Sequence, residues 1–157
     1  FEIERAKRFS RTVTVVMLDM DRFKSVNDGY DHLFGSYVIS EVGKIIRNMT
    51  RAVDIPARYG GDEFLIVLSE IPLSGVEAFC ERLRKKVEET TFTQGMDSIR
   101  LTLSIGYATL TAADNFSAKE LVRRADMALY EAKRQGRNLA LEYQPEYDRL
   151  NKIKKAA

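Results

Sequence analysis

The fold of this chain is decided by the stretch Arg58-Tyr59-Gly60-Gly61-Asp62-Glu63-Phe64. Its two glycines lack a Cβ, so the backbone can take a positive φ and a ligand can approach the main chain closely. The two acids that follow point to opposite faces of the strand they begin, and residues 64–68 form a near-continuous apolar run that is typical of a buried strand. The stretch therefore predicts a hairpin tip, anchored in the core, whose carboxylates suit a divalent metal ion on a polyphosphate.

A second group of acids follows an apolar run near the start of the chain. Residues 13–18 predict another buried strand, and this run ends in Asp19-Met20-Asp21. Magnesium is usually held by one or two carboxylates together with substrate phosphates, so Asp19 and Asp62, from a neighbouring hairpin, could clamp a nucleoside triphosphate. The simpler alternative is that both groups of acids only form turns.

Composition sets broad limits on the protein. The chain has 157 residues, the length of one domain, and 45% of them are hydrophobic, which is enough for a core. It has no apolar stretch that could span a bilayer and no secretory signal pattern, so we expect a soluble, cytoplasmic protein without membrane contact. Basic residues number 25 against 23 acids, a net charge of +2, which predicts no nucleic-acid partner.

The chain has a single cysteine and a single histidine. Cys80 lies in a segment with helical periodicity, where we expect a buried structural thiol and no internal disulfide. His32 cannot build a multi-histidine metal site on its own, and we expect it to shape a loop.

Hydrophobic periodicity predicts strands at 12–19, 56–59, 63–69, 99–109 and 139–143, and helices at about 34–49, 74–89 and 117–134. This alternation predicts an α/β sandwich, with helices packed on a central, mostly antiparallel sheet. Residues 1–10 are charged and helix-prone and predict the end of an incoming linker helix. We expect the domain itself at 11–145 and a solvated tail at 146–157.

Three separated motifs resemble the GGDEF-domain nucleotidyl cyclases, best known as diguanylate cyclases, which join two GTP molecules into cyclic di-GMP. Besides residues 58–64, the resemblance includes residues 18–28, then Tyr30-Asp31-His32 with Gly35, and residues 123–133 running into Gly136-Arg137-Asn138. It covers most of the chain, from about Arg11 to Asn138. The resemblance implies the ferredoxin-like core of nucleotide cyclases and palm polymerases. It also implies that an N-terminal regulatory domain is missing from this chain.

The resemblance further implies a reaction. Two domains would face each other as a homodimer, and the 3′-hydroxyl of one nucleotide would attack the α-phosphorus of the other. Two such attacks close the ring and release two pyrophosphates. Mg²⁺ (or Mn²⁺), two ions per active site, would be held by Asp19, the main-chain carbonyl of Met20 and Asp62. Asp62 and Glu63 are the catalytic candidates, and Glu63 is either a second metal ligand or the base.

Phosphate binding is expected at two places. Phe23 and Lys24 lie in the loop after the first strand, where main-chain N–H groups can cradle the terminal phosphates. Lys133 and Arg137 match the two phosphate-binding cations of the family. Because they stand at i and i+4 around a helix end, a solvated pair of cations is the alternative.

The base pocket departs from the common pattern of the family. Most members have an asparagine and, nine residues later, an aspartate after a glycine; here Asn27 is present, but Gly35 is followed by Ser36. An aspartate accepts hydrogen bonds from guanine, whereas a serine hydroxyl can donate or accept and so suits guanine or adenine. This serine is associated with the hybrid promiscuous subgroup, which makes 3′,3′-cyclic GMP-AMP as well as cyclic di-GMP and cyclic di-AMP. We expect GTP and ATP as substrates; a guanine pocket kept by Asn27, hence a GTP-specific enzyme, or loss of activity are the alternatives.

The run Arg51-Ala52-Val53-Asp54 matches the RxxD inhibitory site of the family, in which arginine and aspartate bind cyclic di-GMP. Taken alone, this spacing more often marks a surface ion pair. It leaves open a second function, a catalytically inactive receptor that binds a cyclic dinucleotide through Arg51 and Asp54. The intact acids and cations of the predicted active site favour the enzyme, because a receptor needs none of them.

Overall fold

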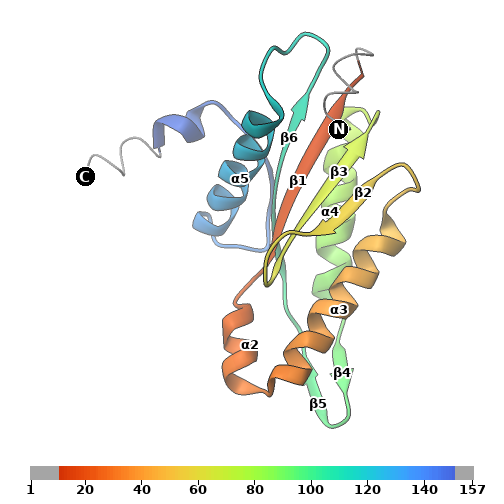
Figure 1. Cartoon of the computed structure of the whole chain (residues 1–157). Coiled ribbons are helices and arrows are strands. Elements are labelled where there is room, and N and C mark those ends of the chain that lie inside the picture. The colour runs from red at the N-terminus through yellow and green to blue at the C-terminus, as the bar shows by residue number, and fades with distance from the viewer. Residues whose placement is uncertain (1–10, 151–157) are drawn as a thin grey trace.

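The computed structural model describes residues 11–150. In chain order, its elements are β1 (Val13–Met20), α2 (Phe23–Gly29), α3 (His32–Met49), β2 (Ile55–Arg58), β3 (Glu63–Ser69), α4 (Leu73–Glu89), β4 (Phe92–Gln94), β5 (Asp97–Ile99), β6 (Leu103–Leu110), α5 (Ala118–Arg134) and β7 (Ala140–Glu142) (Figure 1). The expected linker helix at 1–10 and the end of the expected tail, 151–157, lie outside the described residues. None of the helices within 11–150 combines the length and the apolar character of a membrane span.

A five-stranded sheet with the order β2-β3-β1-β6-β7 forms the centre of the molecule. The pairs β2–β3, β3–β1 and β1–β6 are antiparallel, and β6–β7 is parallel. This arrangement confirms the predicted sandwich with a mostly antiparallel central sheet. Its register places Asp19, near the end of β1, between Glu63 on β3 and Ser104 on β6.

Helices cover both faces of the sheet, with α3 and α4 on one side and α5 on the other (Figure 1). Alternate residues of β1 serve the two layers: Leu18 and Met20 pack with α3 and α4, whereas Val15 and Met17 pack with α5. Every residue of β1 is therefore buried. Full burial of an aliphatic side chain contributes about 1.5 to 3 kcal/mol, so β1 gives a functional group at its end a well-packed support.

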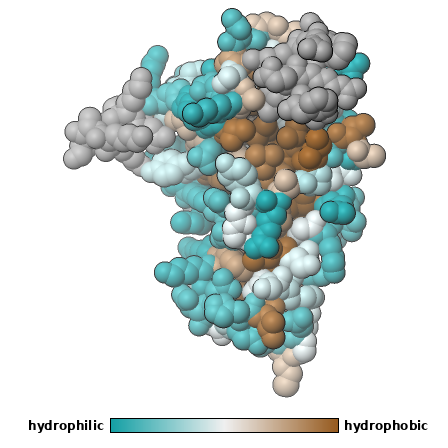
Figure 2. Space-filling view, viewed as in Figure 1, coloured by the Kyte–Doolittle hydropathy of each residue, from teal (hydrophilic) through white to brown (hydrophobic). Residues whose placement is uncertain are grey.

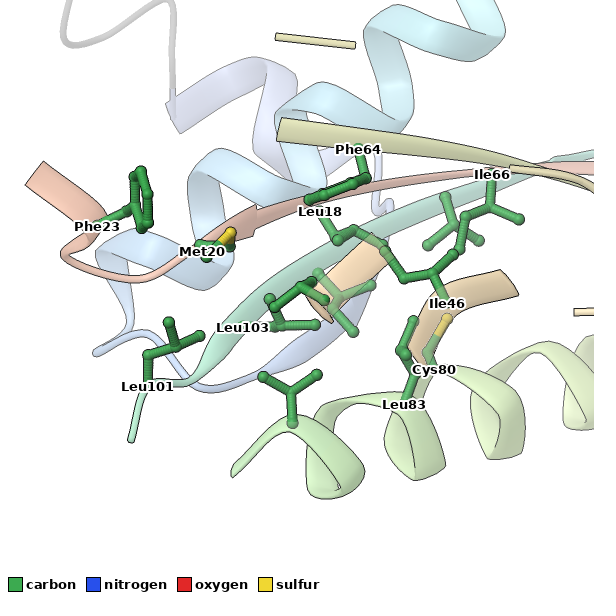
Figure 3. Close-up of a cluster of buried hydrophobic side chains, with 14 of the residues drawn as sticks. Leu18, Met20, Phe23, Ile46, Phe64, Ile66, Cys80, Leu83, Leu101 and Leu103 are labelled. Carbon is green, nitrogen blue, oxygen red and sulfur yellow. The ribbon is translucent and has the colours of Figure 1, made fainter. Parts of the chain in front are cut away.

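The larger core lies between the sheet and α4, where Figure 3 shows Cys80 and Leu83 directed toward the strands. Both side chains are fully buried. Burial raises the pKa of the Cys80 thiol far above its ordinary value. Cys80 is thus a buried structural thiol, as predicted.

Within residues 11–150, no helix packs over part of the opposite face of the sheet. Helix α5 packs on β1, β6 and β7, whereas Leu65 and Val67 of β3 are half-buried and Ile55 of β2 is 44% exposed. Figure 2 shows hydrophobic side chains gathered over this side of the molecule.

Helix α5 lies unusually close to β6 because of one glycine. A Cβ on Gly106 would lie 2.0 Å from the main-chain nitrogen of Leu129 and 2.4 Å from the carbonyl oxygen of Ala125. Any side chain at Gly106 would therefore push α5 outward. This contact sets the distance between the sheet and α5, whose last turn carries Lys133.

Helix α2 differs from the expectation that residues 23 and 24 lie in a loop. It is a short helix of 7 residues, with Phe23 and Val26 one turn apart and buried in the core. The following helix begins at His32, which therefore starts α3 and does not shape a loop. Its N-cap is Asp31, whose Oδ1 accepts a hydrogen bond from the Phe34 N–H at 2.7 Å.

The predicted strand 99–109 is two elements. Residues 97–99 pair with 92–94 in a separate hairpin, β4–β5, which turns at Gly95 with a φ of 61°. Strand β6 then starts at Leu103. Leu101, between the two elements, is also apolar and buried. The pattern of hydrophobicity therefore did not reveal the boundary.

The start of the expected tail packs on the domain. Residues 146–150 form a helical turn. Within it, Asp148 accepts a hydrogen bond from Arg123 of α5 at 2.7 Å and another from the Tyr143 hydroxyl.

Candidate active site at the end of strand β1

The hairpin between β2 and β3 brings Asp62 to the end of β1. The Met20 N–H donates to the carbonyl oxygen of Asp62 at 3.1 Å, which joins the two segments. The hairpin is closed by the N–H groups of Tyr59 and Gly60, which donate to the Glu63 carbonyl oxygen at 2.9 and 3.2 Å. Asp62 is therefore held beside β1 by main-chain hydrogen bonds on both sides.

The glycines of this tip work by close contact. Neither has a positive φ, so the tip does not use the left-handed backbone that glycine permits. A Cβ on Gly60 would lie 2.6 Å from Oε2 of Glu63, whereas a Cβ on Gly61 would meet nothing within 4 Å. Gly60 thus makes room for the Glu63 side chain, and Gly61 leaves the tip open. The Arg58 guanidinium donates to the carbonyl oxygens of Gly60 and Gly61 at 2.8 to 3.1 Å and braces the turn.

Asp19 is buried and incompletely bonded. Its Oδ2 accepts a hydrogen bond from the Lys133 ammonium, whereas its Oδ1 is buried with no hydrogen-bond partner in the described structure. Burial raises the pKa of Asp19, Lys133 opposes this and the neighbouring Asp62 carboxylate adds to it, and the net result is a pKa of about 6. A buried carboxylate oxygen without a donor is costly, and a cation would satisfy it.

The residues present fit a divalent cation. Asp19, Asp62 and the Met20 carbonyl are oxygen donors, which Mg²⁺ and Mn²⁺ prefer. Within residues 11–150, no three acid, cysteine or histidine side chains converge into a ready metal cluster. A cation here would therefore take its other ligands from phosphate and water, as Mg²⁺ commonly does in nucleotide sites.

Asp21 has a different role from Asp19, although both stand at the end of the same strand. Its oxygens accept hydrogen bonds from the hydroxyls of Thr102 and Ser104, at 2.7 and 2.6 Å, and from the Asn138 N–H at 3.1 Å. These bonds tie β1 to β6 and to the segment after α5. Asp21 is a structural acid, and nothing in its local sequence separates it from Asp19.

Two candidate cations lie at the end of α5, and one of them reaches the site. Lys133 lies in the last turn and its ammonium pairs with Asp19, so Lys133 is not the solvated cation of the alternative interpretation. Arg137 follows the helix with a φ of 66°, and its N–H donates to the Ala132 carbonyl oxygen at 3.0 Å. Its guanidinium is exposed.

Asn138 holds this segment in place, and sequence reasoning assigned it no role. Its φ is 51°, a left-handed value that asparagine tolerates better than most residues. Its Oδ1 accepts from Arg84 at 2.6 Å and its Nδ2 donates to Glu88 at 2.7 Å, both on α4. The position of asparagine directly after Gly136-Arg137 is the only sequence signal of such a turn.

The two base-pocket candidates lie on α2 and α3, which pack together. A Cβ on Gly35 would lie 2.2 Å from Oδ1 of Asn27, so only glycine allows this contact. Ser36 is the next residue on α3 and is exposed. It lines a cavity of about 550 Å³ between α3 and the β2–β3 hairpin, together with Arg58 and Phe64.

The two phosphate-cradle candidates begin α2. Phe23 turns its side chain into the core, at 5% exposure, and the side chain of Lys24 is exposed. Arg22 precedes them with a φ of 56° and supplies no side-chain cap. Only the main chain of Phe23 can face a ligand.

The RxxD residues form a closed pair apart from this site. The Arg51 guanidinium donates to both oxygens of Asp54, at 2.8 and 3.1 Å, and to the Ser69 carbonyl oxygen at 2.7 Å. The Asp54 side chain is 2% exposed. Burial alone would raise the pKa of Asp54, but the hydrogen bonds from Arg51 hold it below its ordinary value.

Comparison with known proteins identifies the family. The model of the family described as "Diguanylate cyclase, GGDEF domain" matches residues 1–139. The chain belongs to the GGDEF family. Solved structures of this family share the fold of this GGDEF domain and confirm the predicted fold class. The GGDEF domain of DgcB from Caulobacter crescentus, determined in complex with c-di-GMP, has a TM-score of 0.83 and 30% identity, over 89% of this chain and 82% of that one. The active GGEEF domain of a diguanylate cyclase from Vibrio cholerae has a TM-score of 0.82 and 30% identity, over 90% and 89% of the two chains.

Curated relatives of this GGDEF domain are longer proteins. Diguanylate cyclase A of Treponema denticola is 43% identical over 138 residues, which are 88% of this chain and 37% of that protein. Diguanylate cyclase DosC of Escherichia coli K12 is 38% identical, and the response regulator PleD of Caulobacter vibrioides is 34% identical; each alignment covers 87% of this chain and 30% of the relative. The GGDEF domain described here thus spans about a third of the curated relatives it matches.

Proposed function

We propose that this GGDEF domain is a cyclic dinucleotide synthase that condenses two nucleoside triphosphates and releases two pyrophosphates. The observation that carries the proposal is the buried Oδ1 of Asp19, which has no hydrogen-bond partner in the described structure, on a carboxylate that pairs with Lys133 through Oδ2 and is affected by the charge of Asp62. It supports a site that a metal-bound nucleotide completes. The names of the relatives, among them diguanylate cyclase A and DosC, support the same class of reaction.

Asp19, the Met20 carbonyl and Asp62 would hold Mg²⁺ (or Mn²⁺), two ions per active site. Such ions neutralise the charge that develops on the α-phosphate and lower the pKa of the attacking 3′-hydroxyl. With a pKa of about 6, Asp19 is mostly ionised at neutral pH and ready to bind a cation. Glu63, whose carboxylate lies beside Gly60, would serve as a further ligand or as the base.

The chain's own cations and amides would position the triphosphate. Lys133 reaches the site from α5, and the loss of its bond to Asp19 on metal binding would free its ammonium for a phosphate oxygen. Arg137 adds a guanidinium whose planar fork suits phosphate oxygens. The main-chain N–H groups of Phe23 and Lys24, at the start of α2, would contact the terminal phosphates.

The substrates in this proposal are GTP and ATP. Asn27 and Ser36 would contact the base, and the Ser36 hydroxyl can accept from guanine N1–H or donate to adenine N1. Loss of a bidentate carboxylate contact removes discrimination of about 1 to 3 kcal/mol between the bases. The expected products are 3′,3′-cyclic GMP-AMP, cyclic di-GMP and some cyclic di-AMP.

Two further features belong to the proposal. Each domain would hold one nucleotide, so ring closure needs a homodimer. An upstream regulatory domain would control the formation of this dimer, and the protein would act in the cytoplasm. Arg51 and Asp54 would bind a cyclic dinucleotide as an inhibitory site. Because Asp54 is buried under Arg51, the half-exposed guanidinium is the group that offers contact to such a ligand.

Incubation with Mg²⁺ and equal ATP and GTP, followed by mass analysis of the products, tests the proposal. The expected result is a mixed GMP-AMP product from the wild type and cyclic di-GMP alone from Ser36→Asp. Ser40→Asp is a matched control, because Ser40 is exposed one turn further along α3 and lines the same cavity. It should still incorporate ATP.

Other outcomes select the alternatives. Cyclic di-GMP alone from the wild type would identify a GTP-specific diguanylate cyclase. No product at high protein concentration would favour a receptor that binds through Arg51 and Asp54.

A further inference from the structure

A second group of cations lies around a cavity of about 480 Å³. Three segments line it: the start of α2, the link between β5 and β6, and the segment after α5. Figure 1 shows these segments converging beyond the lower end of β1. Each segment contributes one arginine, namely Arg22, Arg100 and Arg137, and the cavity has one acid, Asp21.

The three arginines are largely uncommitted. Within residues 11–150, the side chains of Arg22 and Arg137 donate no hydrogen bond, and Arg100 donates only its Nε, to the Thr91 hydroxyl at 3.0 Å. All three residues are exposed. Cations that face one cavity without acid partners repel one another, and a bound anion would relieve this repulsion.

Asp21 does not pair with these arginines. Its two oxygens are occupied by the hydroxyls of Thr102 and Ser104 and by the Asn138 N–H. Its role is to hold the walls of the cavity together, since those partners come from the β6 side and from the segment after α5. The cavity therefore keeps an excess of positive charge and a fixed frame.

The cavity is distinct from the base-binding side of α2. At 100° per residue, Ser25, which lines the cavity, lies about 160° around α2 from Asn27. Neither Lys24 nor Lys133 lines it. Among the residues assigned to the nucleotide, Arg137 alone is shared.

We propose that this cavity is a second anion site, which binds a pyrophosphate-type anion through Arg22 and Arg100 and shares Arg137 with the nucleotide site. Guanidinium groups bind phosphate oxygens in pairs, and the cavity volume is ample for such an anion. Pyrophosphate is the leaving group of the proposed reaction, so its natural source rests on the proposed function. The site would receive the leaving group beside Arg137, on the far side of α2 from the base.

Calorimetric titration of the chain with inorganic pyrophosphate, without divalent ions and at low salt, tests the site. Arg100→Gln and Arg22→Gln should each weaken binding by about tenfold or more, because each removes a charge-assisted contact. Arg82→Gln is the matched control, since Arg82 is an exposed arginine on α4 away from the cavity, and it should bind within about twofold of the wild type. Unchanged binding in both cavity variants would overturn the proposal.

A second titration, with a non-hydrolysable GTP analogue and Mg²⁺, separates the two sites. Arg100→Gln should change this affinity by less than about twofold. An equal loss for pyrophosphate and nucleotide would make the cavity part of the nucleotide site and overturn the distinction. Pyrophosphate binding that depends on Arg100 in a chain that makes no cyclic dinucleotide would uphold this site and refute the proposed function. Formation of cyclic dinucleotide by a chain that shows no Arg100-dependent pyrophosphate binding would support the proposed function and refute this site.

Discussion

Asp19 and Asp54 are both buried acids paired with a basic side chain, but the two pairs differ in completeness. Both oxygens of Asp54 accept hydrogen bonds, from Arg51, and its pKa is held below the ordinary value. Asp19 has one oxygen on Lys133 and one without a partner, and its pKa is raised to about 6. Both oxygens of Asp54 are satisfied within the chain, whereas the Lys133 pairing at the end of β1 leaves Oδ1 of Asp19 without a donor in the described structure.

This difference separates a stabilising pair from a functional one. A buried, unsatisfied polar group costs about 1 to 3 kcal/mol, and a charge-assisted hydrogen bond contributes about 1.5 to 3 kcal/mol. In the absence of a ligand, the unsatisfied oxygen of Asp19 therefore lowers the free energy of unfolding, whereas the Arg51–Asp54 pair raises it. Substitutions at the two aspartates should accordingly affect different properties.

The largest expected effect is the loss of activity in Asp19→Asn. The amide keeps the shape but cannot bind a cation as a carboxylate does, so kcat/KM should fall by about 10²- to 10³-fold. Asp97→Asn, at an exposed acid on β5, is the control and should keep normal rates. Initial rates of cyclic dinucleotide formation measure this. Activity within tenfold of the wild type would contradict a metal role for Asp19.

Asp54→Asn should act on stability. It removes the ion pair under Arg51 and weakens the link to Ser69, so the free energy of unfolding should fall by about 2 kcal/mol. Urea denaturation at pH 7 measures this, with Asp97→Asn again as the surface control. If Asp54→Asn lowered the free energy of unfolding no more than Asp97→Asn does, the Arg51–Asp54 pair would not be a stabilising contact.

The pH dependence of stability should have opposite signs at the two aspartates. Because the folded-state pKa of Asp54 lies below its ordinary 3.8, its stabilisation is present above that value and is lost as the pH falls through the folded-state pKa. For Asp19, the folded-state pKa of about 6 lies above 3.8, so metal-free protein should gain stability as the pH falls through this range. Denaturation in EDTA, with Asp54→Asn and Asp19→Asn as references, measures both slopes. Slopes of the same sign at the two sites would break the comparison.

The smallest effect is expected at the clamp on the segment after α5. Asn138→Gly removes the side-chain bonds to Arg84 and Glu88 but suits the left-handed backbone, so any change reports the clamp alone. Arg137 would be held less firmly, and KM for the nucleotide should rise about threefold with a smaller change in kcat. Steady-state kinetics measure this split; a fall in kcat at constant KM would argue against a positioning role.

Sequence reasoning located the end of β1 and the hairpin tip because acids after buried apolar runs are distinctive. The antiparallel register brings Asp19 opposite Glu63, a pairing that the sequence pattern did not specify. The different roles of Asp19 and Asp21 were not predictable. They depend on hydroxyls that come from the β6 side of the sheet, more than 80 residues along the chain.

The local features that sequence reasoning missed have short or misleading patterns. Helix α2 has two buried apolar residues in 7, too few for a clear helical period. Gly60 and Gly61 suggested a positive φ, but the requirement at Gly60 is space for Glu63. The contacts of Asn138 with α4 join residues about 50 positions apart, which no local pattern shows.

The central claim is that the end of β1 is completed by a divalent cation, and Mn²⁺ binding tests it most directly. Calorimetric titration with a non-hydrolysable GTP analogue present should show binding to the wild type and to Asp97→Asn. Asp19→Asn should bind at least about tenfold more weakly. Equal Mn²⁺ affinity in the wild type and Asp19→Asn would contradict the account.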